Sequence, residues 1–212
     1  MQMETIMAFK KKLLTLRQQL IGARYFNALS ALDFAMVYHV GTRKDGITPE
    51  FQHQVEIALY ALTLADVKYR EAVIATIMLH DVREDYGIIS SEITALFDNA
   101  EFAQMVNRAV ENMTKEWRGE KKDEALLFDA MANDPVASIA KGCDRIHNLG
   151  SMVGVFKIEK QKEYLEEVDR LFIPMLKTAR KRFPFQHNAY MNILHMMRSQ
   201  CELIEAIHKS VN

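Results

Sequence analysis

An apolar stretch leads directly into ionisable residues in the segment AVIATIMLHDVREDYG, which covers residues 72–87. Residues 72–79 are almost entirely apolar, and a helix without a polar face is normally buried in the middle of a domain. His80 and Asp81 come next, so the helix would carry both side chains to the core. Burying a carboxylate without a partner is costly, so this position requires a metal ion, a cation or a polar cavity.

Two more acids continue the pattern at helical spacing. Residues four apart share one face of a helix, so Glu84 lies one turn beyond His80, and Asp85 lies one turn beyond Asp81. This arrangement favours a metal ion with a general base beside it. The alternative is that His80 and Asp81 form a satisfied buried pair and that the two later acids mark an exposed helix end.

Two residues elsewhere in the chain have the right type and position to join such a site. His53 lies just past the first turn of a helix that Thr48 and Pro49 are expected to start, because Thr caps helices and Pro fits their first position. Asp144 borders the apolar stripe of a later helix. Two imidazoles and two carboxylates could therefore converge on one ion, and this ligation suits Mn²⁺, Fe²⁺, Mg²⁺ or Zn²⁺.

The elements that must position these residues are predicted to be helices. Only 8 Gly and 4 Pro occur in 212 residues, which leaves little room for a many-stranded protein, and no segment reads as a convincing strand. Apolar periodicity and helix-start signals predict about eight to ten helices, over about residues 4–20, 23–40, 48–64, 66–87, 90–97, 101–113, 124–132, 157–174 and 187–208, with a further one that Asp134 and Pro135 start and whose apolar stripe runs from Val136 to Ile146. We expect an all-α fold and a single domain over residues 1–212, with residues 115–123 forming a mobile loop or an exposed helix start.

Composition excludes several classes of protein. The net charge of −1 gives no reason to expect binding to a nucleic acid polymer or an acidic membrane. The two cysteines, Cys143 and Cys201, are too few and too far apart for a disulfide framework or a thiolate zinc site. No apolar run reaches about 18 residues, and the N-terminus lacks the apolar segment of a signal peptide. We therefore expect a soluble, cytoplasmic protein.

Several longer motifs occur in a fixed order over about residues 35–167. They are HVGTRKDG (39–46), His53, LHDVRED (79–85), KGCDRIHNLGSM (141–152) and KQKEYLEE (160–167). In this combination the chain resembles the HD-domain phosphohydrolases and, within them, the hydrolase domain of the RelA/SpoT homologues, which remove the 3′-pyrophosphate of guanosine tetra- and pentaphosphate. The resemblance implies an HD-domain helical bundle with extra helices at both ends. No alarmone synthetase domain is recognisable, which favours a small, stand-alone hydrolase.

The resemblance also implies roles for individual residues. The implied ligands of one metal ion, usually Mn²⁺, are His53, His80, Asp81 and Asp144. The implied pair that positions and activates the attacking water is Glu84 and Asp85. The implied nucleotide contacts are Arg43, Lys44, Asn148, Lys160 and Tyr164. His39 is expected to support the basic loop by hydrogen bonding, and His147 to support the site without being a ligand.

The chain departs from the family pattern at three points. The loop between Gly46 and His53 is one residue longer than usual, Gln54 replaces a common Pro, and Phe128 stands where Tyr is common.

Three functions remain open from the sequence. The first is hydrolysis of the 3′-pyrophosphate of a guanosine alarmone, or of an adenosine analogue, to GDP or GTP and pyrophosphate. The second is a broader nucleotide phosphatase acting on deoxynucleotides or on the 2′-phosphate of NADPH. The third is a non-catalytic protein that sequesters an alarmone or pairs with a toxin. The expected partner is a nucleotide substrate, with a homodimer as a further possibility.

Overall fold

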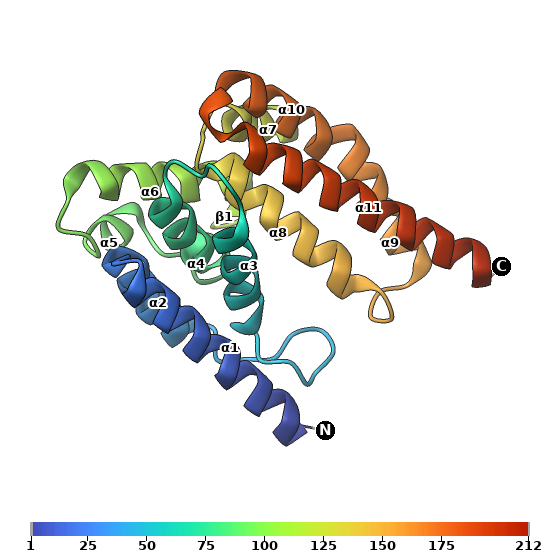
Figure 1. Cartoon of the computed structure of the whole chain (residues 1–212), viewed down its shortest axis with the longest axis horizontal. Helices are drawn as coiled ribbons and strands as arrows, with labels where there is room; N and C mark the ends of the chain where they lie inside the picture. The colour runs from blue at the N-terminus through green and yellow to red at the C-terminus, as the bar shows by residue number, and fades with distance from the viewer. Residues whose placement is uncertain (1, 212) are drawn as a thin grey trace.

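The computed structural model describes residues 2–211, which are helical apart from loops and one small hairpin (Figure 1). The helices are α1 (Gln2–Gly22), α2 (Phe26–Tyr38), α3 (Gln52–Thr63), α4 (Arg70–Tyr86), α5 (Ser90–Thr94), α6 (Ala100–Met113), α7 (Glu124–Ala132), α8 (Ala137–Met152), α9 (Ile158–Glu167), α10 (Ile173–Arg182) and α11 (His187–Val211). The strands β1 (Glu116–Trp117) and β2 (Glu120–Lys121) pair in antiparallel orientation. The all-α fold predicted from the sequence is confirmed.

Helix α4 lies at the centre of the bundle, where it packs against α2, α3, α6 and α8. Every residue from Ala72 to His80 is buried, as the apolar character of this stretch predicts. Gly87 ends the helix in the left-handed conformation with φ of 69°, which glycine adopts without steric cost. The central position of α4 fixes His80 and Asp81 where the surrounding helices can reach them.

The first two residues of α4 hold neighbouring helix ends in place. The guanidinium group of Arg70 donates to carbonyl oxygens at the C-terminal end of α3 at 2.5–3.0 Å. The carboxylate of Glu71 accepts a 2.8 Å hydrogen bond from the backbone of Asn27, at the start of α2, which has no side-chain cap of its own. Both contacts satisfy backbone groups that helix ends leave unpaired, and they orient α2 and α3 around α4.

Helix α8 crosses α3 and α4 and carries the other side of the candidate site. Asp134 lies just before it and accepts hydrogen bonds from the backbone of Val136 and Ala137 at 2.8 and 3.0 Å, which fixes the turn that leads into the helix. A Cβ atom at Gly142 would lie only 2.8 Å from the side chain of Ile193. The absence of a side chain at this position therefore allows α11 to pack closely along α8.

The start of α3 differs from the prediction. Thr48 and Pro49 do not begin the helix; they lie in a loop in which Pro49 forms an isolated bridge with Thr42. Asp45 binds the Thr48 hydroxyl at 2.5 Å, so this threonine completes a turn rather than a helix cap. Helix α3 begins at Gln52, so His53 is its second residue.

Two other segments also differ from the prediction. The charged segment 115–123 contains the β1–β2 hairpin, whose turn residues Arg118 and Gly119 both have positive φ, as tight hairpin turns require. The helix predicted to end at Pro174 continues instead through a turn of π-helix over residues 168–172 into α10, where Pro174 occupies the first turn.

Both cysteines are free: Cys143 is buried in α8, and Cys201 is half-buried in α11. Within residues 2–211, none of the helices combines the length and the apolar character that spanning a bilayer requires.

Candidate active site

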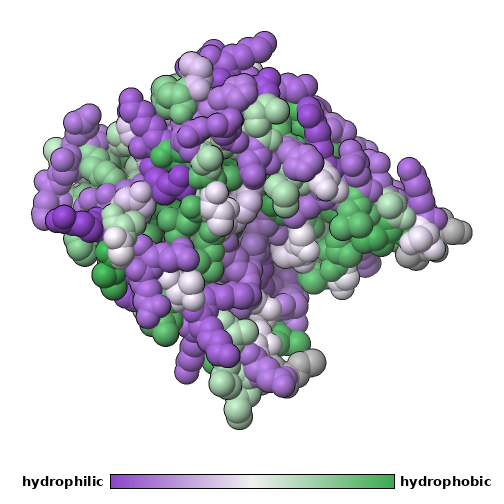
Figure 2. Space-filling view, viewed as in Figure 1, coloured by the Kyte–Doolittle hydropathy of each residue, from purple (hydrophilic) through white to green (hydrophobic). Residues whose placement is uncertain are grey.

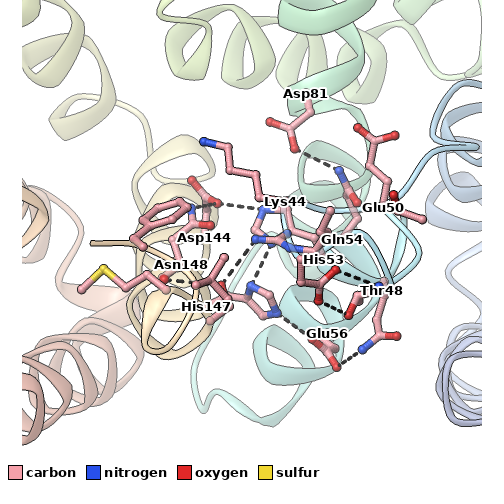
Figure 3. Close-up of a pocket in the computed structure, with 18 of the residues that line it drawn as sticks. Lys44, Thr48, Glu50, His53, Gln54, Glu56, Asp81, Asp144, His147 and Asn148 are labelled. Atoms are coloured by element: carbon pink, nitrogen blue, oxygen red, sulfur yellow. Dashed lines mark hydrogen bonds and ion pairs between the residues drawn. The ribbon is translucent and has the colours of Figure 1, made fainter. Parts of the chain in front are cut away.

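A polar cavity of about 680 Å³ opens between the loop that precedes α3, the end of α4 and the length of α8. On the face seen in Figure 2, the surface is hollowed where the N-terminal helices meet α8, and hydrophilic residues line this hollow. Figure 3 shows side chains from α3, α4 and α8 pointing toward one another inside the cavity. Segments far apart in the sequence thus contribute to one site.

The four residues expected to bind a metal lie together, and three of them, His53, Asp81 and Asp144, line this cavity. Nε2 of His80 lies 3.0 Å from Oδ1 of Asp81 and 3.9 Å from Oδ1 of Asp144. Nε2 of His53 lies 3.1 Å from the same oxygen of Asp144. One ligand atom each from His53, His80 and Asp81 falls within a 4.8 Å span. These distances are short enough for one ion to contact His53, His80 and Asp81, and Asp144 lies beside both histidines.

The hydrogen bonding of His80 tests whether a cation fits here. Its Nδ1 atom lies 2.8 Å from the carbonyl oxygen of Ile77, which can only accept, so Nδ1 carries the proton. In the neutral ring, Nε2 then directs a lone pair at the carboxylate of Asp81. Two acceptors at this distance repel unless a proton or a cation lies between them. The nitrogen and oxygen donor set therefore fits a divalent metal ion.

Asp144 is held in its charged form by its neighbours. Burial alone would raise the pKa of Asp144, but the Lys141 ammonium at 2.8 Å and the hydrogen bond with His53 hold it well below its usual range. Asn148, one turn later on α8, donates to Oδ1 of Asp144 at 2.8 Å. Lys141, which the sequence analysis did not single out, precedes Asp144 by three residues on one helix face, a spacing that could have identified it.

Hydrogen bonds from α3 and α8 also orient His53 and Asp81 (Figure 3). The buried Gln54 donates to Oδ2 of Asp81 at 2.9 Å, so the departure from the usual Pro supplies a ligand-supporting contact. Nδ1 of His147 lies 2.8 Å from Nδ1 of His53, as its expected supporting role requires. Nε2 of His147 lies 2.6 Å from Glu56, which the sequence analysis missed although it follows His53 by three residues on α3.

The two acids after the His-Asp pair lie at the rim of the cavity. Oε2 of Glu84 accepts a 2.8 Å hydrogen bond from the backbone of Lys115, which ties the start of the β1–β2 hairpin to the end of α4. Partial burial, together with the nearby carboxylates of Asp81 and Glu84, raises the pKa of Asp85 to about 6. A carboxylate with such a pKa can exchange a proton near neutral pH.

Arg43 and Lys44 lie on a loop whose shape is fixed by its own residues. Asp45 accepts backbone hydrogen bonds from Ile47 and Thr48 at 2.9 Å each. Gly46 between them has φ of 70°, a conformation that favours glycine. The loop brings Arg43 within 3.4 Å of the Ser151 hydroxyl and the Lys44 ammonium 4.8 Å from the centre of the Phe156 ring.

Of the three remaining residues expected to contact the nucleotide, two line the cavity and one does not. Tyr164 lines the cavity, where its ring packs against Phe156 with the centroids 5.7 Å apart. Asn148 also lines it, although its amide is engaged with Asp144. Lys160 is not brought to the cavity, because its ammonium pairs with Glu163 at 2.5 Å on the exposed surface of α9. The Lys160 ammonium lies 5.6 Å from the centre of the Tyr164 ring, which does line the cavity.

His39 supports the basic loop differently from the prediction. Its ring is buried, stacks on Phe51 with centroids 5.9 Å apart and meets the edge of Tyr86. Neither ring nitrogen has a hydrogen-bond partner, and the nearest carboxylate oxygen, from Glu50, is 3.7 Å away. The expectation of hydrogen bonding was therefore wrong: aromatic packing holds this residue.

Comparison with known proteins agrees with this geometry. The family model described as "HD domain" matches residues 31–181, which is more than half of the chain and includes all of the candidate metal ligands. The chain belongs to the HD-domain family. Its central feature, the His80-Asp81 pair at the end of a buried helix, lies within the matched region.

Similar curated proteins extend the comparison. Over 148 residues the chain is 30% identical to a protein of Synechocystis sp. named probable guanosine-3′,5′-bis(diphosphate) 3′-pyrophosphohydrolase, covering 68% of this chain and 19% of that protein. It is 29% identical to the GTP pyrophosphokinase rsh of Brucella ovis over 150 residues, covering 67% of this chain and 19% of the relative. It is 26% identical to the guanosine-3′,5′-bis(diphosphate) 3′-pyrophosphohydrolase of Borreliella burgdorferi over 170 residues, covering 74% of this chain and 25% of that protein. The chain thus spans only about a fifth to a quarter of the length of these relatives.

Two helices flank the region matched by the HD-domain model. Helix α1 packs against α2 and α3, and α11 packs along α8 and α10. Both therefore support helices that carry residues of the site, and α1 contributes a side chain, Lys12, that contacts Glu56 at 2.5 Å.

Proposed function

We propose that this HD domain is a metal-dependent phosphohydrolase that removes the 3′-pyrophosphate of a guanosine alarmone. The observation that carries the proposal is the cluster of His53, His80, Asp81 and Asp144 with two further acids at the rim of the same cavity. The names of the relatives point to the same substrate, and the basic loop supplies groups suited to it.

The charge of the cavity supports metal dependence. Seven carboxylates line it, but only three cationic side chains do, and one of these, Lys141, is paired with Asp144. A substrate that carries two pyrophosphate groups would be repelled from such a site unless a divalent ion balanced the charge. We propose His53, His80, Asp81 and Asp144 as the ligands and Mn²⁺ as the preferred ion. When bound, such an ion stabilises charge on phosphoryl oxygens and acidifies water.

We assign the handling of the attacking water to Glu84 and Asp85. Water must lose a proton as its oxygen bonds to phosphorus, while the bond from that phosphorus to the 3′ oxygen breaks and the 3′ oxygen gains a proton. Asp85, with its pKa near 6, can accept the first proton, and Glu84 beside it can orient the water. The products are GDP or GTP and pyrophosphate.

Substrate binding is assigned to the basic loop and to the side chains that face it. Arg43 can fork onto a phosphate or stack on a planar base, and Lys44 can act as a point charge. Tyr164 offers an aromatic surface on the facing side of the cavity. Asn148 is assigned a contact to ribose or phosphate through the face that is not engaged with Asp144.

A panel of nucleotides tests the proposal. Mn²⁺-loaded protein is incubated with a 3′-pyrophosphorylated guanosine nucleotide, its adenosine analogue, a deoxynucleotide triphosphate, NADPH and a simple phosphate monoester, and the products are separated. We expect release of pyrophosphate from the guanosine nucleotide and none from metal-free protein.

Equal or faster turnover of the deoxynucleotide, of NADPH or of the monoester would replace the proposal with a broader nucleotide phosphatase. Tight binding of the guanosine nucleotide without any turnover would favour the non-catalytic function.

A further inference from the structure

A line of polar contacts leads from helix α1 to the candidate metal ligand His53. Nζ of Lys12 lies 2.5 Å from Oε1 of Glu56, and the other oxygen of Glu56 lies 2.6 Å from Nε2 of His147. Nδ1 of His147 in turn lies 2.8 Å from Nδ1 of His53. The labelled residues His53, Glu56 and His147 can be followed in Figure 3, where dashed lines join them.

The two ends of this line determine where the protons lie. Burial would raise the pKa of Glu56, but hydrogen bonds from His147, Lys12 and Gln52 outweigh it and lower the pKa to about 2. It is therefore charged and can only accept, which places a proton on Nε2 of His147. If Nε2 of His53 is to face a metal ion, the proton of its ring must lie on Nδ1, and Nδ1 of His53 then donates to Nδ1 of His147.

This assignment matters because the two nitrogens of His53 have opposite roles. With the proton on Nδ1, Nε2 keeps its lone pair for a metal ion, whereas with the proton on Nε2 the ring donates to Asp144, 3.1 Å away. In the other tautomer, a proton would occupy the position that a metal ligand requires. A hydrogen bond at the remote nitrogen commonly sets the tautomer and ring orientation of a ligating histidine.

We propose that His147 and Glu56 are positioning residues that fix the metal-binding tautomer of His53, and that Lys12 anchors them from α1. The proposal rests on the assignment of His53 as a metal ligand in the proposed function. It gives α1, which lies outside the region matched by the HD-domain model, a part in assembling the site. Glu56 can take this role only because α1 and α8 pack against α3 and bring Lys12 and His147 into contact with it.

Variants of His147 separate positioning from simple packing. His147→Phe keeps an aromatic ring but removes the acceptor for Nδ1 of His53. His147→Asn is smaller, yet its amide oxygen can accept that hydrogen bond. Losing such a supporting contact typically weakens metal binding by about 10- to 100-fold. We expect this loss in His147→Phe and a smaller one in His147→Asn, whereas a role in packing alone predicts the opposite order or equal losses.

The measurements use the full chain. Titration calorimetry with MnCl₂ gives the metal affinity. The tautomer of His53 is measured by ¹⁵N NMR of the metal-free protein. The His53 resonance is assigned by its absence from the spectrum of His53→Gln. We expect His147→Phe to shift the proton of the His53 ring from Nδ1 toward Nε2 relative to the wild type, because Nδ1 loses its acceptor while Asp144 still faces Nε2. An unchanged tautomer together with Mn²⁺ affinity within about twofold of the wild type would overturn the proposal.

Lys12→Met tests the anchor without disturbing the core, which keeps the proposal falsifiable if His147→Phe does not fold. Lys11→Met, on the neighbouring exposed position, is the matched control. We expect weaker Mn²⁺ binding only for Lys12→Met, and equal affinities for the two variants would remove α1 from the proposal. Because neither measurement needs a nucleotide, failure of the alarmone assay would leave the result on His53 intact, and the reverse also holds.

Discussion

Replacing Glu84 with Gln removes a carboxylate from the rim of the candidate site with little change in shape. In the wild type, Oε2 of Glu84 accepts a 2.8 Å hydrogen bond from the backbone of Lys115. The amide oxygen of Gln can accept the same bond, so the β1–β2 hairpin should stay attached to α4. What the variant loses is a negative charge next to Asp85 and a group that orients or deprotonates water.

The expected size of the effect follows from these roles. Loss of a general base or its close partner typically lowers kcat by about a hundred-fold to ten-thousand-fold, which corresponds to about 2.7 to 5.5 kcal/mol of activation free energy. Glu84 is outside the cluster formed by His53, His80 and Asp81, so the Mn²⁺ stoichiometry should not change. KM should also stay close to the wild-type value, because an acid next to phosphates contributes no attraction in the ground state.

The assay measures pyrophosphate release from a 3′-pyrophosphorylated guanosine nucleotide over a range of substrate concentrations. Metal content is measured on the same protein samples. Glu120→Gln is the matched control, since it makes the same chemical change at an exposed position on β2 of the same hairpin. It should retain wild-type kcat, KM and metal content.

Two results would refute this reasoning. Loss of the metal from Glu84→Gln would mean that this residue is a ligand or supports one, and kcat within about threefold of wild type would leave no role for it in the chemistry. A loss shared by Glu120→Gln would instead assign the effect to the hairpin.

Four further predictions concern the ligands, the substrate, the packing and the pH dependence. Asp144→Ala should abolish both Mn²⁺ binding and turnover, and full metal occupancy measured by elemental analysis would remove it from the ligand set. Arg43→Ala should mainly raise KM, and Arg43→Lys should restore it poorly because an ammonium can neither fork onto a phosphate nor stack on a base; an unchanged KM would speak against the alarmone assignment. Gly142→Val should lower the free energy of unfolding by about 1–3 kcal/mol in chemical denaturation, because a Cβ there would lie 2.8 Å from a side chain of α11, whereas Gly22→Ala, in open space, should not. Asp85 acts as a base only when deprotonated, and its pKa is raised to about 6, so kcat/KM should fall about tenfold per pH unit below that value. A bound cation should move this acidic fall in the pH profile to lower pH, and Asp85→Asn should not show it.

Local sequence patterns determined much of the fold and the identity of the clustered residues. The apolar stretch before His80 predicts a buried helix because, at 3.6 residues per turn, it leaves no polar face, and α4 is indeed central. Spacing alone places Glu84 and Asp85 one turn beyond His80 and Asp81, since helical periodicity is a property of neighbouring residues. Residue type then limits the chemistry, because imidazole and carboxylate groups gathered in a core favour the binding of a cation.

Only the tertiary structure decided which side chains support these residues. Lys12, Glu56 and His147 come from three helices, and their contacts depend on how α1 and α8 pack against α3, which no local periodicity specifies. In the same way, Lys160 matches the family motif but pairs with Glu163, because two residues three apart on an exposed helix turn meet before either reaches the cavity. Sequence spacing fixes the face of a helix on which a residue lies, whereas the partner of that face is set by packing between helices distant in the chain.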